Sequence, residues 1–182
     1  MTTSIIAAIR RINRTIALLV GFVLISCVFL ILADIVFREF GVSFGGSDEI
    51  SGYVMAGTAS WGMAYALTEL AHVRIDLIRL RLRSMAQALM DLFAITALAG
   101  TTIVIAVQGW PVLSKTLERG SRANTPLETP LWIPQVFWLS GWVWFATCAS
   151  LLVLLTLVLL WQRDLKQADA LVGARSELEL EQ

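Results

Sequence analysis

Three carboxylates lie at or near the ends of apolar segments, where they could carry protons or ions across a membrane. They are Asp34, Glu69 and Asp91, and ionisable side chains inside membranes often belong to such paths. Their surroundings favour a structural role instead. Arg38 follows Asp34 by one helical turn, which predicts an ion pair. Asp91 is close enough to the start of its segment to face the basic residues that precede it.

His72 opens a polar segment between the second and third apolar runs. If this segment is helical, His72 and Asp76 face each other one turn apart, while Arg74 points elsewhere. The basic residues that follow are candidates for binding lipid phosphates: Arg79, Arg81 and Arg83. The alternative is an ordinary cytoplasmic loop whose positive charge only sets the orientation of the chain.

Residues that catalysis or metal binding would need are scarce. His72 is the single histidine, and Cys27 and Cys148 are the two cysteines. The chain alone therefore cannot build a histidine-rich metal site or a cysteine-rich zinc or iron–sulfur site. The sequence has no P-loop, glycine-rich nucleotide loop or catalytic-triad pattern. The 14 basic and 14 acidic side chains cancel, so no net charge favours nucleic acid. We therefore expect neither catalytic activity nor a bound cofactor.

The composition is that of a membrane protein. Hydrophobic residues make up 57% of the 182 residues and charged residues 15%, against roughly a quarter charged in soluble domains. Four apolar segments are predicted to be transmembrane helices, because lipid forces a backbone to satisfy its own hydrogen bonds. They comprise residues 15–37, 50–69, 84–113 and 131–161. The last two are long and should tilt, and Pro134 should separate a short interfacial segment, 131–133, from the fourth span. The predicted fold is one all-α membrane domain, residues 1–182.

The basic residues predict the orientation of this domain. Ten of them lie in the N-terminal tail, the loop between spans two and three, and the C-terminal tail, whereas four lie in the other two loops. Because basic residues favour the cytoplasmic side, both termini should be cytoplasmic. The tail 162–182 is short and of mixed charge, so we expect a frayed helix there.

The second apolar segment contains small residues spaced four apart, a pattern typical of close helix–helix contacts in membranes. These residues are Gly52, Ala56, Ser60 and Ala64. They are expected to share one helix face. That face packs either inside this chain or against a separate membrane protein, and the spacing does not choose between the two.

Two stretches resemble the small membrane subunit of tripartite ATP-independent periplasmic (TRAP) transporters. The first begins at Asp48 and follows the family's order of an acidic pair opening the second helix, a glycine and a His-x-Arg-x-Asp-like segment. The matching residues are Glu49, Gly62, His72, Arg74 and Asp76. The second runs from Thr125 to Pro134, with Gly141 beyond it, and is similar to the Pro-Leu-Trp-Ile-Pro start of the family's fourth helix. The chain departs from the family at residues 68–70, where the family usually has a basic pair and a glycine.

The resemblance implies an accessory transport subunit, multi-pass in the bacterial inner membrane and without a cofactor. In such transporters a periplasmic binding protein captures the substrate, commonly an organic acid, and a large membrane subunit moves it with a sodium gradient. The small subunit is then a scaffold that packs against the large subunit and membrane lipids and meets the binding protein transiently. The alternative is a self-contained four-helix transporter that acts as a homodimer, with Asp91 as its coupling acid.

Overall fold

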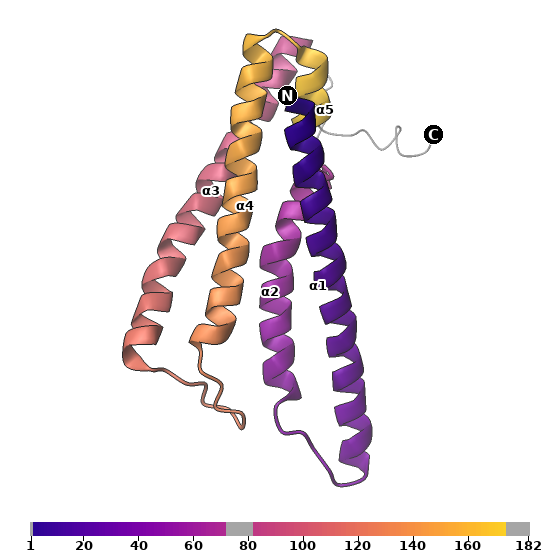
Figure 1. Cartoon of the computed structure of the whole chain (residues 1–182), viewed down its shortest axis with the longest axis vertical. Helices are drawn as coiled ribbons and strands as arrows, with labels where there is room; N and C mark the ends of the chain where they lie inside the picture. Colours follow the sequence, from indigo (N-terminus) through magenta and orange to yellow (C-terminus); the bar gives the residue numbers. More distant parts are fainter. Residues whose placement is uncertain (1, 72–81, 174–182) are drawn as a thin grey trace.

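The structure of the chain, a computed structural model, describes residues 2–71 and 82–173. These residues form four long helices and one short helix: α1 (Thr2–Glu39), α2 (Ser47–Thr68), α3 (Ser84–Arg119), α4 (Trp132–Trp161) and α5 (Leu165–Val172). Helices α1 and α2 form one hairpin, and α3 and α4 form a second one (Figure 1). Loops 40–46 and 120–131 lie at one end of the molecule, and the start of α1 and α5 lie at the other. The prediction of an all-helical fold is confirmed.

Three helices, α1, α3 and α4, are long and apolar enough to cross a membrane. Helix α2 has 22 residues, or about 33 Å of helix against a hydrocarbon core of about 30 Å. Its glycine, serine and threonine residues make it less apolar than the other three. Helix α2 packs against α1 and also against α4, so less of its surface needs to match lipid. Membrane crossing by α2 therefore stays a prediction.

The expected break at Pro134 is wrong. Helix α4 begins at Trp132 and continues without interruption to Trp161, so Pro134 lies in its first turn. Backbone N–H groups in a first turn have no partner within the helix, and a proline there removes no hydrogen bond. Helices α1 and α3 extend beyond the predicted spans, α1 back to Thr2 and α3 on to Arg119.

Helix α5 contributes to the hydrophobic core, although the sequence did not predict a packed helix there. Helix α5 contacts α3 and α4 and buries Ala168, Leu171 and Val172. These side chains join one buried cluster with Ile9 of α1 and residues of α2, α3 and α4. The Asp164 carboxylate accepts a hydrogen bond from the backbone N–H of Gln167 and caps the helix. Residues 165–172 are thus an ordered, packed helix rather than a frayed one.

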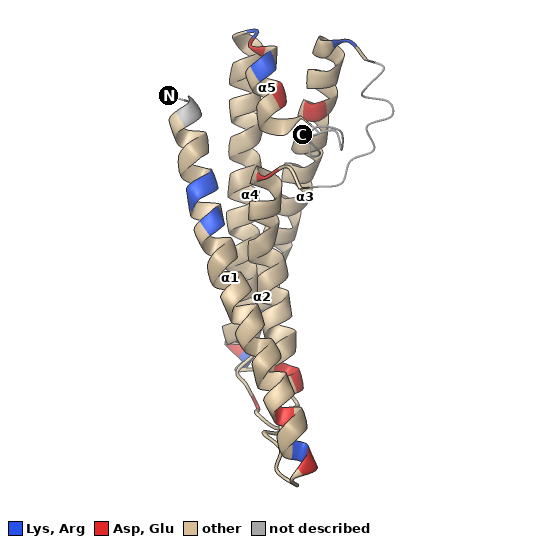
Figure 2. Cartoon of the chain, turned by 90° about the vertical axis from the view of Figure 1, so that its right-hand side faces the viewer, with Lys and Arg blue, Asp and Glu red and all other residues tan. Residues whose placement is uncertain are grey.

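Apolar side chains cover the outward surfaces of the long helices. Phe22 and Phe29 of α1 and Phe93 of α3 are each about two-thirds exposed or more, at 70%, 67% and 75%. Charged residues gather toward the two ends of the molecule and leave the middle uncharged (Figure 2). A contiguous apolar surface of this extent suits contact with lipid or with another membrane protein.

Candidate functional site

Glu49 ties the start of α2 to the loop between α3 and α4. It lies in the first turn of α2, where a carboxylate is favoured by the helix dipole. Its carboxylate accepts hydrogen bonds from the Tyr53 hydroxyl, at 2.7 Å, and from the Thr125 hydroxyl. The hydrogen bond from Thr125 is the main reason why the pKa of Glu49 lies below its ordinary value. Glu49 is therefore an anion that clamps loop 120–131 onto α2.

The turn before α2 approaches the same loop closely. A Cβ atom at Gly46 would lie 2.4 Å from the side chain of Leu127, so a larger residue there would displace that side chain. Gly45 has a φ of 67°, which also favours glycine. Loops 40–46 and 120–131 therefore pack together at one end of the two hairpins.

Because the clamp needs an ionised carboxylate, we expect it to weaken in acid. A carboxyl whose pKa is lowered in the folded state stabilises the fold above its ordinary pKa, and this stabilisation is lost as the pH falls through the lowered value. The melting temperature of the detergent-purified protein should thus fall less steeply with acid in Glu49→Gln than in the wild type. Glu118→Gln, at an exposed position of α3, should keep the wild-type profile. Parallel profiles for Glu49→Gln and wild type would contradict the clamp.

Asp34 closes the turn of the first hairpin. Its carboxylate pairs with the Arg38 guanidinium at 2.6 Å, which confirms the predicted ion pair. It also accepts hydrogen bonds from the Ser47 hydroxyl at 2.6 Å and from the Phe44 backbone N–H at 2.9 Å. Asp34 is only 1% exposed. All of these partners belong to the hairpin of α1 and α2, so the carboxylate stabilises that hairpin.

A buried asparagine joins three helices, and the sequence did not reveal it. Asn13 of α1 is completely buried. Its amide nitrogen donates to the backbone oxygen of Ala64 at 3.0 Å and to the Thr68 hydroxyl at 3.3 Å, both in α2. Its amide oxygen accepts from the indole N–H of Trp144 in α4 at 2.8 Å. We call these four residues the Asn13 junction. The three partners lie 51 to 131 residues from Asn13 along the chain, so no local pattern marks the junction.

The small residues of α2 do not share one face. Steps of four residues rotate by about 40° each around a helix with 3.6 residues per turn, so three steps rotate by about 120°. Gly52 and Ala56 are exposed, whereas Ser60 and Ala64 are completely buried. Ser60 packs against α4, where a Cβ atom at Gly141 would lie 2.4 Å from its hydroxyl oxygen. Ser60 and Ala64 therefore follow the internal alternative, which confines the docking prediction to Gly52 and Ala56.

The other candidates are dispersed. Gly62 is half-buried, and a Cβ atom there would meet nothing within 4 Å. Arg83 is exposed and directly precedes α3. Asp91 is 3% exposed within α3. Five candidates fall outside the described residues: His72, Arg74, Asp76, Arg79 and Arg81. In residues 2–71 and 82–173, no group of histidine, cysteine, aspartate and glutamate side chains could hold a metal ion.

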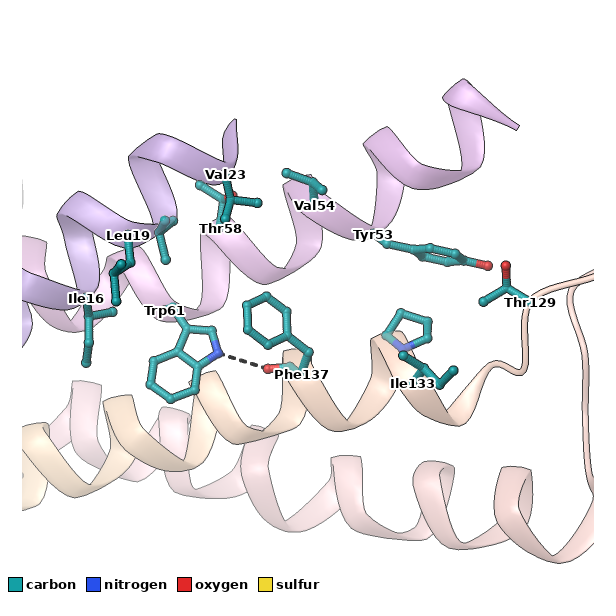
Figure 3. A pocket seen from close by; sticks show the side chains of 12 residues that line it. Ile16, Leu19, Val23, Tyr53, Val54, Thr58, Trp61, Thr129, Ile133 and Phe137 are labelled. Carbon is teal, nitrogen blue, oxygen red and sulfur yellow. Dashed lines mark hydrogen bonds between the residues drawn. The ribbon is translucent and has the colours of Figure 1, made fainter. Parts of the chain in front are cut away.

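An apolar groove lies beside these contacts, between α1 and α4, with α2 as its floor (Figure 3). Its volume is about 540 Å³. Leu19 and Val20 of α1 form one wall, and Ile133 and Phe137 of α4 form the other. The indole N–H of Trp61, in α2, donates to the backbone oxygen of Phe137 at 3.0 Å and joins α2 to α4 across the floor.

One protein family matches most of the chain. The model of the family described as tripartite ATP-independent periplasmic transporters, DctQ component, matches residues 27–165. This range comprises 139 of the 182 residues and includes all of α2, α3 and α4. Comparisons with curated proteins and with solved structures gave no match. The chain belongs to the DctQ family, the small membrane component of tripartite ATP-independent periplasmic transporters.

Proposed function

We propose that this chain is the scaffold subunit of a transporter that imports an organic acid with a sodium gradient. It works with a large membrane subunit, which carries the substrate and sodium sites, and with a periplasmic binding protein. The observation that supports this division is how the chain uses its interior polar groups. Asn13, Asp34 and Glu49 each hold helices or loops of this chain together. The groove of about 540 Å³ is apolar, whereas a carboxylate and a sodium ion need polar ligands.

The continuity of the helices supports the same division. Substrate and ion sites of secondary transporters are typically built where membrane helices are interrupted near the middle of the bilayer. Helices α1, α3 and α4 each run unbroken for 30 residues or more. We therefore place the transport sites on the large subunit and give this chain the task of holding that subunit.

The proposed orientation has both termini in the cytoplasm. Ten of the 14 basic residues lie in the N-terminal part of α1, in the segment between α2 and α3, or after α4, and basic residues favour the cytoplasmic side. We expect reporter fusions at the N-terminus and after Gln182 to show a cytoplasmic location. A reporter inserted near Gly120 should show a periplasmic location. A periplasmic signal from the Gln182 fusion would contradict the proposed number of crossings.

The exposed small residues of α2 are the proposed contact with the large subunit. Hydrophobicity does not drive helix association in lipid, but small residues permit close packing. Ala56→Leu should therefore reduce co-purification of the large subunit while this chain keeps its own yield and melting temperature. Ser60→Leu should instead lower the yield of the chain itself, because Ser60 is buried.

Val104→Leu provides the matched control for this contact. Val104 is 59% exposed on α3, and the change adds apolar volume away from α2. It should leave co-purification unchanged. Normal co-purification of the large subunit with Ala56→Leu would remove this part of α2 from the interface.

A further inference from the structure

Gln108 is a polar residue within the apolar part of α3. Lys115, the next charged residue along the helix, follows it by seven residues, or about 10 Å. The neighbouring Gly109 packs against α4, where a Cβ atom would lie 2.6 Å from the side chain of Leu139. Leu139 is in turn seven residues beyond Trp132, the start of α4. Both helices therefore place Gln108 about 10 Å inside the apolar part of the bundle, too far for its side chain to reach the membrane surface.

The amide of Gln108 finds no partner in its own chain. Gln108 is exposed, and within residues 2–71 and 82–173 no group forms a hydrogen bond with its side chain. Thr101, another exposed polar residue of α3, instead donates to the backbone oxygen of Ala97 in the same helix, at 2.9 Å. A glutamine amide offers two donor hydrogens and an acceptor, and leaving these groups unsatisfied in hydrocarbon is costly. The Gln108 amide therefore needs a partner from another molecule in the membrane.

Gln108 belongs to a line of exposed positions, which we call the α3 seam: Ala97, Thr101, Val104 and Gln108. Steps of four and three residues alternate along it, which keeps the four positions within about 60° of one another around the helix. The small side chains of its first two positions permit a second helix to approach closely. Ile95 and Thr102 are buried and lie on the other side of α3, so the seam points outward. This part of α3 forms one edge of the molecule, opposite α1 (Figure 1).

We propose that the α3 seam pairs with the same seam of a second copy of this chain, with the two Gln108 amides hydrogen-bonded to each other. An amide is both a donor and an acceptor, so two glutamines related by a twofold axis can each donate to the other. Two copies inserted in the same orientation also hold Gln108 at the same depth. The second copy thus supplies the missing hydrogen-bonding group where it is needed, whereas any other helix would have to carry a polar group at that depth.

The charged residues of α3 permit this pairing. Lys115 continues the seam beyond Gln108, and Glu118 and Arg119 follow it, all three exposed. Two Lys115 side chains repel each other, but each can lie beside the Glu118 carboxylate of the other copy. The remaining repulsion is weak, because exposed charges are screened by water and salt. Toward the other end of α3, Asp91 is buried within its own chain and does not reach the seam.

Pairing through α3 leaves the exposed face of α2 free. Helix α4 packs against both α2 and α3 and lies between them, so Gly52 and Ala56 remain available to the large subunit. A pair of chains therefore holds two large subunits side by side. This consequence rests on the proposed function, whereas the pairing itself does not.

Cross-linking in membranes of cells that express the full chain alone tests the pairing. Thr101→Cys places a thiol in the seam, and oxidation with copper phenanthroline should join two copies. Thr96→Cys is the matched control, because Thr96 is also an exposed threonine bonded to its own helix but lies about 140° from Thr101 around α3. It should stay monomeric, as should the wild type, whose Cys27 and Cys148 are buried. Absence of a Thr101→Cys dimer, or equal dimer from both variants, would overturn the proposal.

A second set of variants tests the amide itself. Adding Gln108→Leu to Thr101→Cys should lower the cross-linked fraction severalfold, because leucine has no hydrogen-bonding group. Gln108→Asn keeps an amide and should retain more of the dimer. Both should melt like the wild type in detergent, since Gln108 is exposed. Undiminished cross-linking with Gln108→Leu would refute the pairing of amides. Loss of the large subunit from purified Gln108→Leu would assign the amide to that subunit and would equally refute it.

Discussion

Asn13→Leu is expected to lower the melting temperature of the purified chain by several degrees. Leucine keeps the branching and the number of heavy atoms of the side chain but removes the acceptor for the Trp144 indole N–H, 2.8 Å away. A buried polar group left without a partner costs about 1–3 kcal/mol. A change of 1 kcal/mol shifts the melting temperature of a soluble domain of this size by about 2–4 °C. Thermal unfolding in detergent, followed by circular dichroism, measures the effect.

The double variant Asn13→Leu with Trp144→Phe separates the lost hydrogen bond from other effects. It removes the donor as well as its acceptor, and replacing both partners by apolar groups can be nearly neutral. We therefore expect it to melt above Asn13→Leu. Ser26→Ala, at an exposed position of α1 whose hydroxyl bonds only to its own helix, should melt like the wild type. A wild-type melting temperature for Asn13→Leu would show that the Asn13 junction does not hold the three helices together.

Gly141→Ala is the second change for which we expect a large loss of stability. The added Cβ atom would lie 2.4 Å from the hydroxyl oxygen of Ser60 and 2.8 Å from its Cβ atom, which no rotamer change can move. Trp61 would lie 2.9 Å away and is held by its hydrogen bond to Phe137. Helices α2 and α4 must therefore separate, and overpacking of this kind costs about 1–3 kcal/mol.

Two further variants test the steric explanation. Gly100→Ala adds the same methyl group within α3, where nothing lies within 4 Å. It should keep or raise the melting temperature, since alanine favours a helix by about 1 kcal/mol over glycine. Ser60→Gly in the Gly141→Ala background removes the nearest clashing atoms and should restore part of the stability. Equal melting temperatures for Gly141→Ala and Gly100→Ala would contradict the close contact between α2 and α4.

The sequence predicted the long helices well because their signal is local. Helix α4 was expected at 131–161 and is found at Trp132–Trp161, since its segment is apolar and free of charge. The extension of α1 back to Thr2 was missed because Arg10, Arg11 and Arg14 interrupt the apolar run. Ile9 and Asn13 nevertheless face the core on the side of α1 that the bundle covers.

The contacts between helices could not be predicted in the same way. The Asn13 junction, the Thr125–Glu49 clamp and the Ser60–Gly141 contact each join residues that lie at least 51 positions apart. A small-residue pattern indicates close packing, but the helix rotation that the neighbours impose decides which members are buried. Helix α5 was missed because it has only eight residues, too short a stretch to predict burial without knowledge of α3 and α4.

Reconstituted uptake tests the central proposal, that this chain supports transport without carrying the substrate itself. Liposomes are prepared with this chain alone, with the large membrane subunit of its transporter alone, and with both. Each preparation receives the periplasmic binding protein, a labelled organic acid and an inward sodium gradient. We predict uptake only where both membrane subunits are present. Sodium-dependent uptake by this chain alone would contradict the scaffold role and favour the self-contained transporter, with Asp91 as its coupling acid.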